Sequence, residues 1–201
     1  MIRKILYTAI AIVALVMVFK LMGLHQAYGV MYSTETFGNA IGPDKADQVL
    51  VEVFDYRCSY CRDMYGDLMR FHERNQDVKI IFRPWPIIDK ASIDQADLAL
   101  AAGMQGKFFE VHDLLMQEKH TVDDAFLADI TRRFGLDPAK LKLEMKGRET
   151  GRILLDTHDA AAALGIQSAP TFIAGKIVYS PKTGLPGVED LEKLVAEAYP
   201  E

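Results

Sequence analysis

A buried strand that leads straight into two closely spaced cysteines constrains this chain more than any other feature. The apolar run at residues 49–54 is typical of a strand that is covered on both faces. Cys58-Ser59-Tyr60-Cys61 follows it after three intervening residues, at the start of a helical pattern. These are the only two cysteines in 201 residues. Two thiols at this spacing can close a small disulfide and reopen it, so the pattern indicates redox chemistry where a strand meets a helix.

The length suits one compact domain with a short leader, and the body of the chain is acidic. The formal net charge is −5 for the whole chain. Residues 1–29 hold three basic residues and no acid, which leaves 20 basic and 28 acidic residues, a net charge of −8, for the rest. An acidic body argues against nucleic acid as a partner.

The N-terminal segment has a targeting pattern. Arg3 and Lys4 precede the apolar residues 5–24, and a basic flank of this kind places the N-terminus in the cytoplasm and the body across the membrane. Two outcomes stay open for residues 1–29. The apolar run is close to the roughly 20 residues that a spanning helix needs, which predicts an anchor. Ala27-Tyr28-Gly29 also fits a small-x-small cleavage site, which predicts a signal peptide.

The remaining pattern predicts an α/β domain at residues 49–201 that is interrupted by helices. Residues 30–48 are polar, contain glycine and proline, and are predicted to be a linker. After the strand at 49–54 and the helix from Cys58, the predicted elements are a strand near 78–83, an all-helical block at about 89–147, a helix near 149–164, a hairpin at 171–179 and a closing helix from about 188.

The two cysteines are expected to have different roles. A free cysteine has a pKa of about 8.5, and a helix N-terminus in a Cys-X-X-Cys arrangement lowers it to roughly 3.5–7.5. Cys58 lies where the unpaired N–H groups and partial positive charge of the first turn act, and Arg57 adds a neighbouring cation. Cys58 is therefore predicted to be the exposed nucleophile. Cys61, one turn deeper, is predicted to be the resolving thiol.

Glu52 is the second unusual residue, because it lies in the middle of the apolar strand. A buried carboxylate is unfavourable unless it is paired or protonated. Six residues before Cys58, a buried acid is suited to exchanging a proton with Cys61. The alternative is that Glu52 faces solvent from one side of the strand.

Four segments resemble the DsbA-type disulfide oxidoreductases. Residues 51–61 are similar to the active-site segment of that family, and residues 165–173 to its cis-proline loop. Residues 82–87 and 105–112 resemble the segments that enter and occupy its helical insertion. The resemblance covers about residues 45–199. It implies a thioredoxin fold with an all-helical insertion, periplasmic work on protein thiols, and no bound cofactor.

The resemblance also implies residue roles. It makes Cys58 the nucleophile, Cys61 the resolver, Glu52 the buried acid and Pro170 the cis residue that faces the disulfide. Ala169 would offer its backbone to a substrate chain.

Substrate contacts are further predicted at Ser59 and Tyr60, between the cysteines, and at Trp85. Trp85 stands between two prolines, and either lines a peptide groove near the disulfide or packs in the core.

The chain departs from the family pattern at two positions. The best-known oxidase of the family has Pro-His between its cysteines, whereas this chain has Ser59-Tyr60. Without that histidine a stabiliser of the thiolate is missing, so a weaker oxidant is predicted. Ala169 stands where the family leads us to expect Val or Thr.

The expected function is thiol-disulfide exchange with extracytoplasmic proteins, mainly as a disulfide-forming oxidase that a membrane redox partner recycles. The protein is expected to be periplasmic, either secreted or tethered by residues 5–24. A monomer is expected, because residues 31–48 are too few for a separate dimerisation domain. The alternatives are a client-specific reductase or isomerase and, from another class, a binding module that holds Cu(I) with the two thiolates.

No metal site is predicted. The five histidines are scattered, and there is no second Cys-X-X-Cys, so the ligand spacing of a zinc site is missing. Arg62 rather than histidine follows Cys61, which excludes the pattern for c-type haem attachment.

Overall fold

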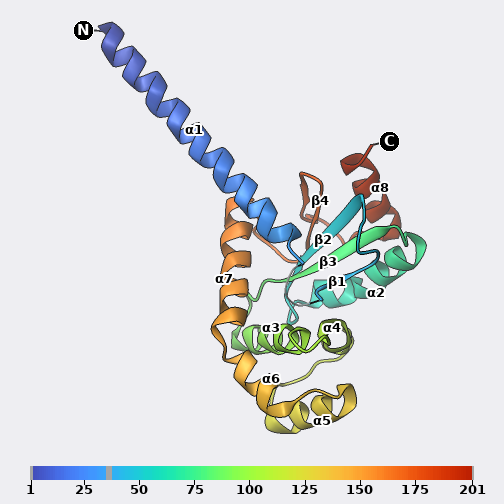
Figure 1. The fold of residues 1–201 in the computed structure, drawn as a ribbon. Coiled ribbons are helices and arrows are strands. Elements are labelled where there is room, and N and C mark those ends of the chain that lie inside the picture. Colours follow the sequence, from blue (N-terminus) through green and yellow to red (C-terminus); the bar gives the residue numbers. More distant parts are fainter. Residues whose placement is uncertain (1, 35–37, 201) are drawn as a thin grey trace.

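A five-stranded mixed sheet forms the centre of the computed structural model, which describes residues 2–34 and 38–200 (Figure 1). The strand order is β1-β3-β2-β4-β5. β2 (Gln48–Phe54) and β3 (Val78–Pro84) are parallel neighbours. β1 (Ala40–Ile41), β4 (Thr171–Ala174) and β5 (Ile177–Tyr179) pair antiparallel with their neighbours.

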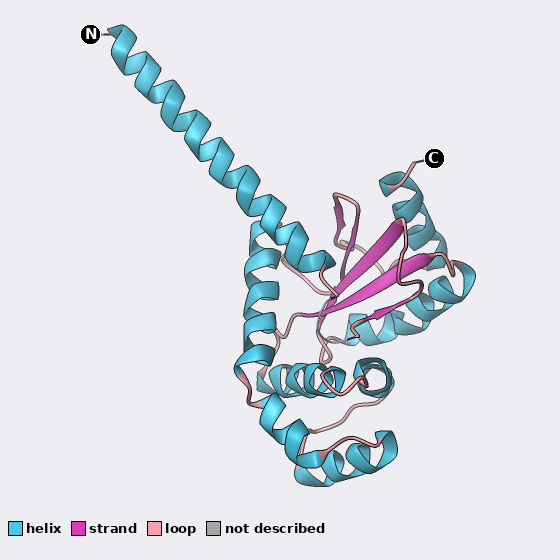
Figure 2. Ribbon diagram, viewed as in Figure 1, coloured by secondary structure: helices cyan, strands magenta, loops and turns pink. Residues whose placement is uncertain are grey.

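Helices cover both faces of the sheet (Figure 2). α2 (Ser59–Arg74) and α8 (Val188–Ala198) pack on one face. α7 (Arg148–Ala163) and the last turns of α1 (Ile2–Tyr32) pack on the other. The insertion comprises α3 (Lys90–Gly103), α4 (Phe108–Gln117), α5 (Asp124–Phe134) and α6 (Pro138–Met145). The predicted α/β fold with a helical insertion between the strand near 78–83 and the helix near 149–164 is confirmed.

β2 separates its side chains between the two cores. Leu50 and Phe54 belong to the cluster under α2 and α8, whereas Val51 and Val53 belong to the cluster under α7 and α1. Successive side chains of a strand point to opposite faces. Glu52 therefore shares the face of Leu50 and Phe54, beneath the helix that carries the cysteines.

The prediction of a linker at residues 30–48 is wrong at its start, near residue 40 and at Gln48, where β2 begins. Residues 30–32 are the end of α1, and Ala40–Ile41 form β1 on β3. Asn39 is buried, where its side-chain amide donates to the Phe82 carbonyl at 2.9 Å. Short strands of this kind are invisible to periodicity because two residues make no pattern. Residues 35–37 of the predicted linker lie outside the described residues.

The N-terminal segment is one helix that continues past the predicted boundary at residue 29. Its first part projects away from the domain (Figure 1). Ala9–Tyr32 is long and apolar enough to cross a membrane, with a mean hydropathy of 1.9. Near the domain end, however, Ala27 and Met31 are buried in the core. The helix therefore belongs in part to the folded domain.

Candidate functional site

Cys58 caps the N-terminus of α2, and its sulfur makes hydrogen bonds to two backbone groups. Its backbone is extended (φ −68°, ψ 117°), and its Sγ accepts a hydrogen bond from the Cys61 N–H at 3.3 Å. The same Sγ–H donates to the Ala169 carbonyl at 3.4 Å. Both cysteines are free thiols in this structure.

The two thiols differ in access, although less than the sequence predicts. Cys58 is 7% exposed and Cys61 is 0% exposed. The expectation of an exposed Cys58 is wrong. The residue is buried, and the Ala169 loop, 111 residues away along the chain, lies against its sulfur. The remaining opening still makes Cys58 the sulfur that an incoming thiolate can reach.

The surroundings of the two sulfurs move their pKa values in opposite directions. The pKa of Cys58 is lowered to about 7, first by a hydrogen bond from the Cys61 side chain and then by the backbone N–H groups of Cys61 and Tyr60. Burial raises the pKa of Cys61, with help from the hydrogen bond to Cys58 and the charge of Glu52. Arg57, expected to assist Cys58, instead pairs with Asp89 at 3.4 Å. Near pH 7 Cys58 is thus about half in the thiolate form, whereas Cys61 remains a thiol.

Glu52 is fully buried beneath α2. Neither of its carboxyl oxygens has a hydrogen-bond partner among the described residues. Burial, followed by the charge of Cys58, raises the pKa of Glu52 to about 8. The solvent-facing alternative is therefore excluded. A carboxylic acid that changes protonation near neutral pH and lies within electrostatic reach of both sulfurs is suited to proton exchange with Cys61.

The loop before β4 completes the site opposite the cysteines. The Ala169–Pro170 peptide bond is cis, and Pro170 is buried. Thr171, the first residue of β4, pairs with Val53 near the end of β2. This register brings Ala169 to Cys58. The cis bond is the one that the family resemblance implied at Pro170.

The residues expected to contact substrate divide into two groups. Ser59 and Tyr60 are exposed, and Tyr60 retains 63% of its surface. Trp85 is only 6% exposed, packs in the core under α7 and donates its Nε1–H to His158 Nδ1 at 3.3 Å. The prediction that Trp85 lines an open peptide groove does not match this position. The alternative of core packing does.

Asp55 is a site residue that the sequence analysis did not single out. Its buried carboxylate accepts from the Arg57 N–H at 2.7 Å and from the N–H groups of Ile87 and Ile88 at 2.8 and 3.1 Å. Its carbonyl accepts from the Cys58 N–H at 3.0 Å. Asp55 therefore ties the turn before Cys58 to the loop that leads into the insertion. An acid directly after a buried strand and three residues before a catalytic motif was the available signal.

Replacing Asp55 with alanine is expected to lower the free energy of unfolding by about 2–3 kcal/mol, because three N–H groups lose a charged acceptor. Urea unfolding of the reduced protein measures the change. Asp63→Ala, at an exposed position on α2, is the matched control and should stay within about 0.5 kcal/mol of the wild type. Equal midpoints for the two variants would contradict the role given to Asp55.

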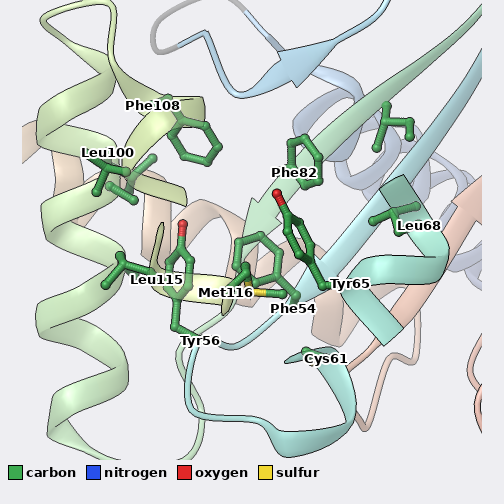
Figure 3. Close-up of a cluster of buried hydrophobic side chains, with 14 of the residues drawn as sticks. Phe54, Tyr56, Cys61, Tyr65, Leu68, Phe82, Leu100, Phe108, Leu115 and Met116 are labelled. Carbon is green, nitrogen blue, oxygen red and sulfur yellow. The ribbon is translucent and has the colours of Figure 1, made fainter. Parts of the chain in front are cut away.

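A buried tyrosine–histidine pair joins the same turn to α4. The Tyr56 hydroxyl lies 3.1 Å from His112 Nδ1. Burial lowers the pKa of His112 to about 3 and raises that of Tyr56, so the hydroxyl donates to a neutral ring. The cluster around them includes Cys61 and several large aromatic residues, and Figure 3 shows Cys61 in that cluster with Phe54, Tyr56, Tyr65 and Phe82. His112 is a core residue, which scattered histidines along a sequence do not reveal.

No metal-ligand cluster accompanies the thiols. In residues 2–34 and 38–200, no group of three or more His, Cys, Asp or Glu side chains is placed to hold a metal ion. The reactive groups that the structure places together at the site are two sulfurs and one carboxyl group.

Comparison with known proteins identifies the fold and the family. A family model described as thioredoxin matches residues 34–196. The thiol-disulfide exchange protein alpha-DsbA2 from Wolbachia pipientis is 22% identical, with 90% of this chain and 96% of that chain covered at a TM-score of 0.75. A thioredoxin-like oxidoreductase from Silicibacter pomeroyi DSS-3 is 28% identical, with 79% of this chain and 90% of that chain covered at a TM-score of 0.71. The catalytic domain of Proteus mirabilis ScsC is 24% identical, with 88% of this chain and 97% of that chain covered at a TM-score of 0.72.

Curated relatives share only one segment with the chain. The Na(+)/H(+) antiporter NhaA 3 of Salinispora tropica is 31% identical over 134 residues, which are 65% of this chain and 20% of the antiporter. The chain thus spans about a fifth of the length of the curated relatives it matches. The similarity concerns that segment of the antiporters alone.

The family model covers most of the chain, and the sheet order, the helical insertion and the paired cysteines before a cis-proline loop agree with it. The chain belongs to the thioredoxin family and has the architecture of its DsbA-type members.

Proposed function

We propose that the protein exchanges disulfides with extracytoplasmic protein thiols, mainly as a disulfide-forming oxidase. The observation that carries the proposal is the opposite acidity of two adjacent sulfurs. The pKa of Cys58 is about 7, whereas that of the buried Cys61 is raised. A typical substrate cysteine has a pKa of about 8.5. Cys58 is thus the better leaving group by about 1.5 pKa units, or roughly 2 kcal/mol, which favours electron flow from substrate to protein.

The oxidising cycle starts from a Cys58–Cys61 disulfide. A substrate thiolate attacks Cys58 Sγ, the internal S–S bond breaks, and Cys61 leaves with the electron pair. Glu52, protonated below a pKa of about 8, gives Cys61 its proton. A second substrate thiolate then attacks the substrate sulfur of the mixed disulfide and releases Cys58 as a thiolate. The substrate gains a disulfide and the protein gains two electrons, which a membrane redox partner removes to restore the internal disulfide.

Substrate contact is proposed for the exposed Ser59 and Tyr60 and for the Ala169–Pro170 backbone. The Ala169 carbonyl already binds the Cys58 thiol, so a substrate chain beside it would lie against the reacting sulfur. The protein is proposed to act as a monomer on the extracytoplasmic side of the membrane.

The moderate acidity of Cys58 also supports a second function, as a client-specific reductase or isomerase. A thiol with a pKa near 7 stabilises the reduced form less than one near 3.5 does. Oxidation of a reduced peptide, reduction of insulin and refolding of a scrambled protein separate the three activities. The oxidase proposal fails if the protein catalyses only the reduction of insulin or only the refolding of the scrambled protein. Copper analysis of the purified protein tests the Cu(I) alternative.

The reduction potential is expected to lie between about −270 mV and −120 mV, the values of a typical reducing thioredoxin and of the strongest oxidase. Equilibration with glutathione buffers measures it. Tyr60→His places a titratable cation beside Cys58 and is expected to make the potential more oxidising, by about 30 mV for each unit by which the Cys58 pKa falls. Tyr60→Phe is the control. A wild-type value at or above about −120 mV would show that the dipeptide does not set the potential.

A further inference from the structure

The last turns of α1 are built into the core of the redox domain. Ala27 is 3% exposed and Met31 is 0% exposed. Both belong to the cluster that covers one face of the sheet, together with Val51, Ile81 and Trp85. A flexible tether has no such burial. A cut after Gly29 would remove Ala27 from this core.

Arg83 fastens the end of α1 to the strand beside the active site. Its guanidinium is buried and donates to the Met31 carbonyl at 3.0 Å and also to the carbonyls of Val30 and Ser33. The last carbonyls of a helix lack partners within the helix and carry partial negative charge, so a cation is well placed there. Arg83 lies opposite Val53 in the register of β3 and β2. The clamp is therefore on β3, directly beside the strand that leads to Cys58.

Two tyrosines fix the helix at a second point. The Tyr28 and Tyr32 hydroxyls donate to the carbonyls of Lys176 and Gly175, each at 2.9 Å. Gly175 and Lys176 form the turn between β4 and β5, at the far end of the sheet from Arg83. Two separate attachments prevent both tilting and rotation of the helix end against the domain.

The first part of the same helix has the length and surface of a membrane span. Its large side chains from Tyr7 to Leu24 are exposed and almost all apolar. Residues 5–24 extend about 30 Å at 1.5 Å per residue, which matches the hydrocarbon core of a bilayer. Only two residues separate Leu24 from the buried Ala27, and α1 has no break between them. The domain thus begins within about one helical turn of the span.

We propose that α1 is retained as a membrane anchor and that Arg83 couples it rigidly to the redox domain. The active site is thereby held at one height and in one orientation over the bilayer. A partner within the membrane could then contact Cys58 directly, because the domain would not have to reorient on a flexible linker. This inference rests on the extracytoplasmic location proposed above and is independent of the direction of exchange.

Retention is tested by expressing the full chain in a bacterium. The protein is expected to stay in the membrane fraction during alkaline carbonate extraction. Its intact mass after purification is expected to be that of the uncut chain, 22.5 kDa. A mature protein that begins at Val30 would overturn the proposal. So would a carbonate-soluble oligomer, which would assign the apolar face of α1 to a second copy of the chain.

Rigid coupling is tested by the fluorescence anisotropy decay of Trp85, the only tryptophan, in phosphatidylethanolamine–phosphatidylglycerol vesicles. Because Trp85 is packed in the core, it reports motion of the whole domain. The wild type is expected to keep a high residual anisotropy through the nanosecond range. A Gly-Ser-Gly-Ser-Gly insertion between His25 and Gln26 is expected to abolish it. Gly23→Ala, where an added Cβ meets nothing within 4 Å, is the matched control and should leave it unchanged.

Arg83→Met tests the clamp itself, and hydrogen exchange at the backbone amides of residues 27–32 is the readout. Protection is expected to fall at least tenfold, whereas Arg74→Met, at an exposed arginine on α2, should leave it unchanged. If Arg83→Met does not fold, the insertion variant still tests rigid coupling, because the insertion precedes the buried end of α1 and leaves the domain intact. Equal anisotropy decays for the wild type and the insertion variant overturn rigid coupling. Alkylation of Cys58 in the same samples reports the redox site separately.

Discussion

Cys61→Ala is expected to abolish catalytic oxidation. It is also expected to capture substrates that carry a disulfide, because the Cys58 thiolate attacks one substrate sulfur and the other leaves as a thiolate. Without the second sulfur no internal disulfide exists to accept electrons, and a mixed disulfide has no internal thiol to release it. The structure adds a second effect. The hydrogen bond from the Cys61 side chain is the largest cause that lowers the Cys58 pKa, so this variant should titrate closer to an ordinary cysteine. Capture of substrates should therefore improve as the pH rises above 7.

Cys61→Ser separates these two effects. Serine cannot resolve a disulfide, but its hydroxyl can still donate to Cys58 Sγ. The pH dependence of iodoacetamide alkylation should have a midpoint near 7 in the wild type and in Cys61→Ser, and a clearly higher midpoint in Cys61→Ala. Cys58→Ser should show no alkylation at neutral pH, because Cys61 is fully buried. Identical midpoints for the serine and alanine variants would contradict the proposed source of the Cys58 acidity.

Glu52→Gln is expected to stabilise the reduced protein at high pH by several kcal/mol. The pKa of Glu52 is about 8 in the folded state and about 4.5 without burial. Between these values the folded protein binds one proton more than the unfolded chain, so stability falls as the pH rises from about 4.5 to 8. The full penalty corresponds to about 5 kcal/mol and the part present at pH 7 to about 3 kcal/mol, at 1.36 kcal/mol per unit. Glutamine carries no charge and removes this dependence.

Urea unfolding at pH 4, 7 and 8.5 measures this effect. The two proteins should be similar at pH 4 and diverge as the pH rises. The rate of thiol-disulfide exchange should fall about tenfold or more in Glu52→Gln, because Cys61 loses the group that gives and takes its proton. Asp97→Asn is the matched control, because burial also raises the pKa of Asp97, to about 6, but on α3 away from the thiols. A stability gain without slower exchange would restrict Glu52 to a structural role.

The local parts of the fold were predictable because each has a local physical cause. The apolar run of β2 and the paired cysteines at a helix start indicated a redox site. Helical periodicity over about 89–147 indicated the insertion. These signals need only neighbours along the chain, since strands and helices set their own side-chain periods.

The assembly of the site was not predictable in this way. Cys58 meets Ala169 across 111 residues and Arg83 meets the end of α1 across about 50, and no periodicity encodes either contact. The same distance in sequence explains why Cys58 was expected to be exposed and residues 30–48 were expected to be a linker. The family resemblance, rather than the residue pattern, pointed to Pro170.

The sequence by itself determined which sulfur begins the helix, which acid lies in the buried strand, and that an apolar segment precedes the domain. Only the tertiary structure decided that Glu52 lies beneath α2 with no hydrogen-bond partner among the described residues, that Asp55 ties the active-site turn to the insertion, and that α1 ends inside the core. The physical reason is that the residue type fixes what a group can do, whereas burial and the distance to its neighbours fix its charge state and its reach.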